Sequence, residues 1–127
     1  MSASVSAYDA VLAQAKAYGE AVYYAHADVF EAMCHDRFQM TLVEGDDATF
    51  WDKAAYLERV RGRMPFDGDP SYEVLSVDVA GPIARVHLWV DVPPLRYEDH
   101  LGFVQQDDAW KLLTKVFRTQ ARLDGGE

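Results

Sequence analysis

The spacing of hydrophobic residues changes about half-way along this chain of 127 residues. From Tyr8 to Val22 they recur every third or fourth position, which predicts a helix of about 18 residues with one apolar face. Ser6, placed before Asp9, is suited to cap the start of this helix, and Ser4 is the other candidate.

Two shorter helices and one strand are expected in the rest of the first half. Asp28 opens a short helix, and Thr49 with Asp52 is suited to cap a third helix. A strand is expected over residues 37–43, followed by a turn over 44–48. The apolar residues that alternate along one face of this strand are Phe38, Met40 and Leu42.

The second half of the chain alternates between apolar and polar residues with period two, which predicts strands. Gly81-Pro82, Pro93-Pro94 and Asp107-Asp108 mark the turns between them. The expected strands cover residues 71–80, 83–92, 95–105 and 109–119. Helices followed by an antiparallel sheet indicate the α+β class. We expect one domain over residues 1–127, with an ordered core at about 5–119.

A tight turn at Asp107-Asp108 sets the register of the last two strands, because Gln106 then pairs with Ala109. One face of this hairpin is nearly all apolar and should contact the helices. Its residues are Tyr97, Asp99, Leu101 and Phe103 beside Trp110, Leu112, Thr114 and Val116. Asp99 and Thr114 interrupt it. A buried carboxylate costs several kcal/mol unless it is paired, hydrogen-bonded or protonated.

Asp99 is therefore the main candidate for an acid, a base or a ligand anchor. The alternative is a structural carboxylate bonded to helix groups or to Tyr24. Tyr24 and His26 follow the first helix and are candidates to join Asp99 in acid–base catalysis. The expected ligand-binding residues are Tyr97, Trp110, Thr114, Trp51, Tyr56 and Phe103.

The opposite sheet face combines aromatic and charged residues, which is typical of a subunit interface. We predict a homodimer through this outer face. Its expected contact residues are Val74, His87, Trp89, His100, Leu113, Lys115 and Phe117. The two histidines among them are interpreted as hydrogen-bonding residues of the interface and not as metal ligands.

Composition excludes several classes of function. Hydrophobic residues make up 50% and aromatic residues 13% of the chain, which is too rich for a disordered protein. The net charge of −9 argues against nucleic-acid and membrane partners. One cysteine, Cys34, excludes an intrachain disulfide. No cofactor or metal is predicted, and the N-terminus lacks the pattern of an export signal, so a cytoplasmic protein is expected.

Four segments together resemble the nuclear transport factor 2-like superfamily. Within it, the chain resembles the small bacterial, polyketide cyclase-like proteins described as "putative lumazine-binding". The similar segments are residues 18–28, residues 30–42, Tyr97-Glu-Asp-His-Leu-Gly-Phe103 and Asp108-Ala-Trp-Lys-Leu-Leu-Thr-Lys-Val-Phe117. The resemblance implies a cone-shaped sheet wrapped around helices, a pocket at its open end, and a homodimer through the outer sheet face.

Three functions are compatible with these observations. The first is binding of a small apolar or aromatic molecule in the cone, anchored by Asp99. The second is a cofactor-free isomerase, cyclase or dehydratase in which Asp99 or His26 transfers a proton. The third is a dimeric scaffold without catalytic activity, whose pocket is filled by its own side chains.

Overall fold

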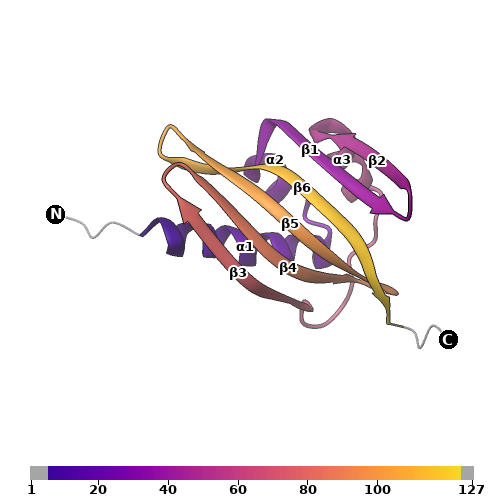
Figure 1. Ribbon diagram of the computed structural model, residues 1–127. Coiled ribbons are helices and arrows are strands. Elements are labelled where there is room, and N and C mark those ends of the chain that lie inside the picture. The colour runs from indigo at the N-terminus through magenta and orange to yellow at the C-terminus, as the bar shows by residue number, and fades with distance from the viewer. Residues whose placement is uncertain (1–5, 124–127) are drawn as a thin grey trace.

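The computed structural model describes residues 6–123, which form three helices and one curved, unclosed sheet of six strands (Figure 1). The helices are α1 (Ala7–Tyr24), α2 (Ala27–Met33) and α3 (Lys53–Arg61). The strands are β1 (Cys34–Glu44), β2 (Asp47–Asp52), β3 (Tyr72–Ala80), β4 (Ile83–Val92), β5 (Leu95–Gln106) and β6 (Ala109–Arg122). The α+β prediction is confirmed. The alternative cap Ser4 and the last four residues lie outside the described range.

The sheet has the order β2-β1-β6-β5-β4-β3, and its pairs are antiparallel except for β1 with β6. All three helices lie on one side of it, as Figure 1 shows, with α1 across β3 and β4 and with α3 against β1. The predicted apolar stripe of α1 is buried there, including Val11, Ala15, Tyr18 and Val22. None of the described helices is both long and apolar enough to cross a bilayer.

The helix caps explain where two helices begin. Ser6 Oγ accepts a hydrogen bond from the Asp9 backbone N–H at 3.1 Å, as predicted. Asp52 caps α3 in the same way, with its Oδ1 2.8 Å from the Ala55 nitrogen. The expectation that Thr49 belongs to this cap is wrong. Thr49 lies in β2, which pairs with β1 through a tight turn that includes Gly45 at φ 59°.

The register of β5 and β6 is confirmed only over the first part of the hairpin. Gln106 pairs with Ala109 and Phe103 with Leu112, but Gly102 then pairs with Thr114. The extra residue is Leu113, which forms a β-bulge. Because side chains alternate, one extra residue moves the following side chains of β6 to the other face, as far as the second register shift opposite Arg96 and Tyr97.

This bulge corrects four assignments. Thr114 and Val116 lie on the outer face, where Val116 is 48% exposed. Lys115 and Phe117, expected at a dimer interface, point inward and are buried.

A second register shift, between Val74 and Ser76, has the same effect in β3. The assignment of Val74 to the outer face is therefore also wrong. Val74 pairs with Leu88 and packs against the core. The residue at the irregularity, Leu75, is instead 47% exposed.

Candidate functional site

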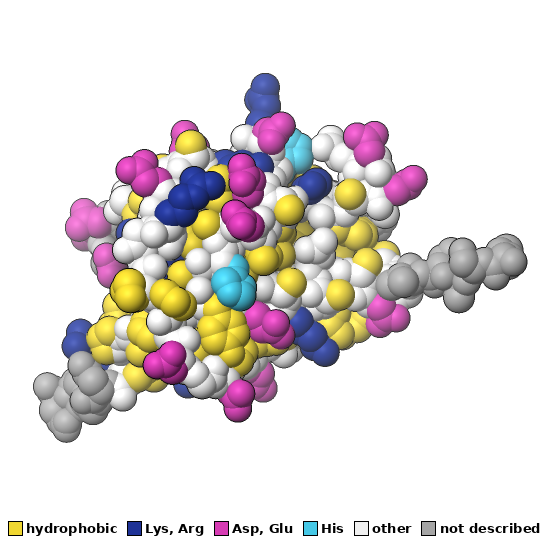
Figure 2. All heavy atoms as spheres, turned by 180° about the vertical axis from the view of Figure 1, so that it is seen from behind, with side chains coloured by type: hydrophobic (Ala, Val, Ile, Leu, Met, Phe, Trp, Pro, Cys, Tyr) yellow, Lys and Arg dark blue, Asp and Glu magenta, His cyan; other side chains and the backbone are white. Residues whose placement is uncertain are grey.

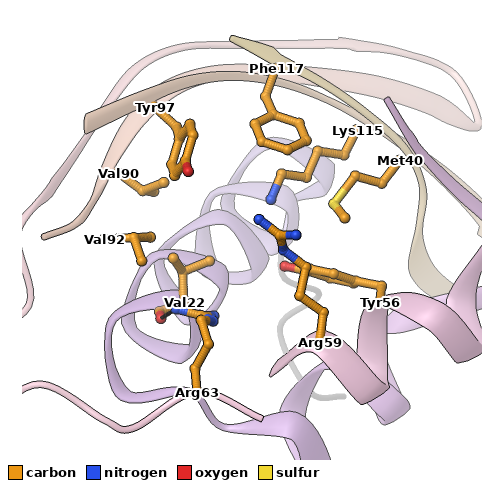
Figure 3. A pocket seen from close by; sticks show the side chains of 10 residues that line it. All are labelled: Val22, Met40, Tyr56, Arg59, Arg63, Val90, Val92, Tyr97, Lys115 and Phe117. Atoms are coloured by element: carbon orange, nitrogen blue, oxygen red, sulfur yellow. Dashed lines mark hydrogen bonds between the residues drawn. The ribbon is translucent and has the colours of Figure 1, made fainter. Parts of the chain in front are cut away.

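A cavity of about 50 Å³ lies between the inner face of the sheet and the end of α3 (Figure 3). One part of its wall is apolar or aromatic, and another part carries positive charge. The lining residues are Val22, Met40, Tyr56, Arg59, Arg63, Val90, Val92, Tyr97, Lys115 and Phe117. No acidic residue of the described chain is among them.

The positive charges come from three places in the sequence. Lys115 reaches in from β6, Arg59 comes from α3, and Arg63 follows the Gly62 that ends α3. Figure 3 shows Lys115 and Arg59 pointing toward the same space below the ring of Phe117. Within residues 6–123 neither arginine forms an ion pair. Three cationic side chains therefore share one small space.

Neighbouring groups hold the two arginines in place. The guanidinium of Arg59 lies 5.0 Å from the ring centroid of Trp51, a cation–π contact. Arg63 Nη1 donates a hydrogen bond to the Val22 carbonyl at 3.1 Å. Burial lowers the pKa of Arg63, and the charge of Arg59 lowers it further.

Lys115 is buried among aromatic rings. Its Nζ lies 5.3, 5.0 and 4.5 Å from the ring centroids of Tyr18, Tyr56 and Phe117. Burial lowers the pKa of Lys115 from 10.5 to about 8, against the opposing attraction of Asp99. The charges of Arg63 and Arg59 lower it as well. The amine is therefore partly neutral near pH 8.

Asp99 is fully buried beside this lysine but does not line the cavity. Tyr18 donates its hydroxyl hydrogen to Asp99 Oδ2 at 2.5 Å, and Lys115 Nζ lies 3.9 Å from the same oxygen. Asp99 Oδ1 has no hydrogen-bond partner in the described chain. Burial raises the pKa of Asp99, with Lys115 and Tyr18 acting in the opposite direction.

The structure brings together only part of the predicted site. Tyr56 and Tyr97 line the cavity, and Trp51 contacts it through Arg59. Phe103 and Trp110 are buried in the core but do not line the cavity. Thr114 was expected to line the pocket, and this is wrong because the bulge at Leu113 turns it outward.

Tyr24 and His26 do not lie with Asp99 along this cavity. The Tyr24 hydroxyl donates to the Gly68 carbonyl at 2.6 Å, and His26 is exposed at the start of α2. The tyrosine that bonds to Asp99 is Tyr18, one of the predicted apolar stripe residues of α1. A buried tyrosine at a core position usually finds a partner for its hydroxyl, and this was the available signal.

The outer face retains part of the predicted interface. His87, Trp89 and His100 lie on it, and Leu113 is half-buried at the bulge. The ring of Trp89 is covered by the Arg96 guanidinium at 3.6 Å. The exposed apolar patch is therefore smaller than the alternation of the strands predicts.

Comparison with known proteins places the chain in a family. A family model described as "Putative lumazine-binding" matches residues 6–118. The chain belongs to this family. The predicted relationship to nuclear transport factor 2-like proteins is confirmed. No curated protein matches.

Solved structures similar to this member of the family share its fold. An NTF2-like protein of unknown function from Silicibacter pomeroyi is 21% identical with a TM-score of 0.80, over 87% of this chain and 93% of that one. Another from Shewanella baltica is 15% identical with a TM-score of 0.82, over 95% and 99%. A ketosteroid isomerase-like protein from Erwinia carotovora atroseptica is 18% identical with a TM-score of 0.71, over 90% and 96%.

The surface charge of the helix side agrees with the overall acidity. Figure 2 shows this side, with acidic side chains distributed over it and the basic side chains scattered between them. A nucleic-acid site requires a continuous basic patch, which is not seen on this face of the described residues.

Proposed function

We propose that the cavity binds a small organic anion with an apolar or planar body. The observation that carries this proposal is that Arg59, Arg63 and Lys115 all line one cavity whose remaining wall is apolar and aromatic. The apolar and aromatic wall agrees with the ligand expected from the sequence, and the three cations add the requirement for negative charge.

Electrostatics favours an anion at this position. Burial is the main cause of the lowered pKa of Arg63 and of Lys115, and the neighbouring positive charges lower both values further. A carboxylate between them relieves this repulsion and accepts charge-assisted hydrogen bonds. Tyr56 is buried and lines the cavity as well, with its hydroxyl close to that of Tyr18.

The volume restricts the size of the ligand. An engineered cavity of about 150 Å³ binds benzene, whereas this one measures about 50 Å³. By this comparison only about two or three non-hydrogen atoms, such as those of a carboxylate group alone, fit the space as it stands. A larger acid requires the side chain of Arg59 to move away from the centre of the cavity.

Binding can be tested with acids and their neutral amides. Titration calorimetry should detect propanoate or benzoate and should detect neither propanamide nor benzamide, because only the acids carry charge. Arg63→Gln should weaken binding about tenfold or more, as expected for the loss of a charge-assisted hydrogen bond of about 1.5–3 kcal/mol.

Arg61→Gln is the matched control, because Arg61 lies two residues before Arg63, at the end of α3, but is exposed and pairs with Glu31 at 3.8 Å. It should bind the acids like the unchanged protein. No binding of either acid, or equal binding of acids and amides, would contradict the proposal. The former result would favour the scaffold with a filled pocket.

A second candidate function is cofactor-free proton transfer by Lys115. The supporting observation is an amine with a pKa of about 8 that lines the cavity and contacts a buried carboxylate. Asp99 and His26 are less suited to act directly, since neither lines the cavity. In deuterium oxide, the methyl protons of pyruvate should exchange faster with the protein than without it. Lys115→Met should abolish this gain and Arg61→Gln should keep it.

We also propose that two copies associate through the outer sheet face. A groove of about 360 Å³ lies on this side of the sheet, with Val43, His100 and Val116 among its lining residues. The exposed apolar side chains of Val43 and Val116 support an interface here.

A further inference from the structure

Three potential metal ligands meet on the outer face of the sheet. His87 in β4 pairs directly with His100 in β5, and Glu98 lies two residues before His100 on the same face. One ligand atom from each side chain lies within 4.8 Å of the other two. This cluster faces away from the cavity and has no part in the proposed anion site.

The contacts within the cluster already approach those of a metal site. His87 Nε2 lies 2.6 Å from Glu98 Oε2, and the two imidazole rings stack with centroids 4.5 Å apart and 13° between their planes. Around one zinc ion with bonds of about 2.1 Å, tetrahedral ligand atoms are about 3.4 Å apart. Small side-chain rotations achieve this spacing, and all three side chains are partly exposed.

A neighbouring arginine orients the carboxylate. Arg118 Nε in β6 donates to Glu98 Oε1 at 2.7 Å, which leaves Oε2 directed toward His87. An outer contact of this kind holds a ligand in its coordinating orientation.

We propose that His87, Glu98 and His100 bind a divalent transition-metal ion of the zinc or nickel type. Two imidazoles and one carboxylate form a donor set that suits these ions and not magnesium or calcium, which prefer oxygen donors. Three protein ligands leave a coordination position for water or for a ligand from another molecule. The sequence interpretation considered a metal-ligand role for both histidines and preferred hydrogen bonds at an interface.

The test is titration calorimetry of chelator-treated protein with zinc chloride and with nickel chloride. We expect one ion per chain, and we expect His87→Ala, His100→Ala and Glu98→Gln each to weaken binding at least tenfold. The chain has four histidines, so His26→Ala and His35→Ala complete the set as controls and should leave the affinity unchanged.

Absence of binding would overturn the proposal, as would binding that survives His100→Ala or that depends equally on His26. His100 is exposed, so its substitution should not affect folding, which circular dichroism can verify. Light scattering of the same metal-free samples tests the proposed dimer separately. A mass near 14.3 kDa would contradict the dimer and leave the result for the metal unaffected.

Discussion

Replacing Lys115 with methionine is expected to stabilise the protein at pH 7 by about 3 kcal/mol. Burial lowers the pKa of the amine from 10.5 to about 8. Each pKa unit corresponds to a free-energy cost of about 1.4 kcal/mol for the charged amine, which gives the total of about 3 kcal/mol. Methionine has a similar length and requires no charge inside the protein. The stability should be measured by urea unfolding.

An ion pair that stabilised the fold would lower the pKa of its acid and raise that of its lysine. Asp99 and Lys115 both change in the opposite direction, because burial outweighs their attraction across 3.9 Å. The lysine therefore reduces stability, as functional residues commonly do. A loss of about 3–5 kcal/mol in Lys115→Met, as for the breaking of a stabilising buried pair, would contradict this interpretation.

The advantage of the methionine variant should depend on pH. Below about pH 8 the lysine is protonated in both the folded and unfolded states, so its full cost is present. Between pH 8 and 10.5 the unfolded state holds more protons than the folded state, and the original protein therefore gains stability as the pH rises. The difference between the two proteins should shrink across this range, while contributions of the cysteine and tyrosines cancel in the comparison.

Replacing Tyr18 with phenylalanine is expected to destabilise the protein by about 2–3 kcal/mol at pH 7. The Tyr18 hydroxyl donates the hydrogen bond that Asp99 Oδ2 accepts, and Asp99 Oδ1 already lacks a partner among the described residues. Loss of this donor leaves a fully buried carboxylate without a hydrogen bond. Unfolding should be measured at pH 7 and at acidic pH.

The loss in Tyr18→Phe should be smaller at acidic pH, where protonated Asp99 needs no donor for its charge. The matched control is Tyr8→Phe in the same helix, because Tyr8 is 51% exposed and its substitution should change stability by less than about 0.5 kcal/mol. Equal effects of the two substitutions at pH 7 would show that the bond to Asp99 contributes little.

Periodicity was sufficient for the main features of the fold. The stripe of α1, the cap at Ser6 and the three hairpin turns follow local rules, and each is present in the structure. Strand β2 was missed because its residues carry no apolar alternation, and five of its six side chains are exposed. Its formation depends on pairing with β1 rather than on its own pattern.

The site was harder to predict because a single residue decides which side chains face the cavity. The segment Thr114-Lys115-Val116-Phe117 fits either face, and the hydrophobic pattern favours burial of Val116 over that of a lysine. Only the bulge opposite Gly102 reverses this preference. Arg59 and Arg63 lie at the C-terminal end of α3, where positive charge suits the helix dipole, so their positions in the sequence do not by themselves indicate a site. Their approach to Lys115 depends on this same reversal.

The most direct test of the proposed anion site is a crystal structure of the protein grown with a saturating concentration of propanoate or benzoate. We expect a carboxylate within hydrogen-bond distance of Arg63 or Arg59, with the body of the ligand against Tyr97 and Phe117. A cavity that contains only water at saturation, or a carboxylate bound elsewhere on the protein, would contradict it.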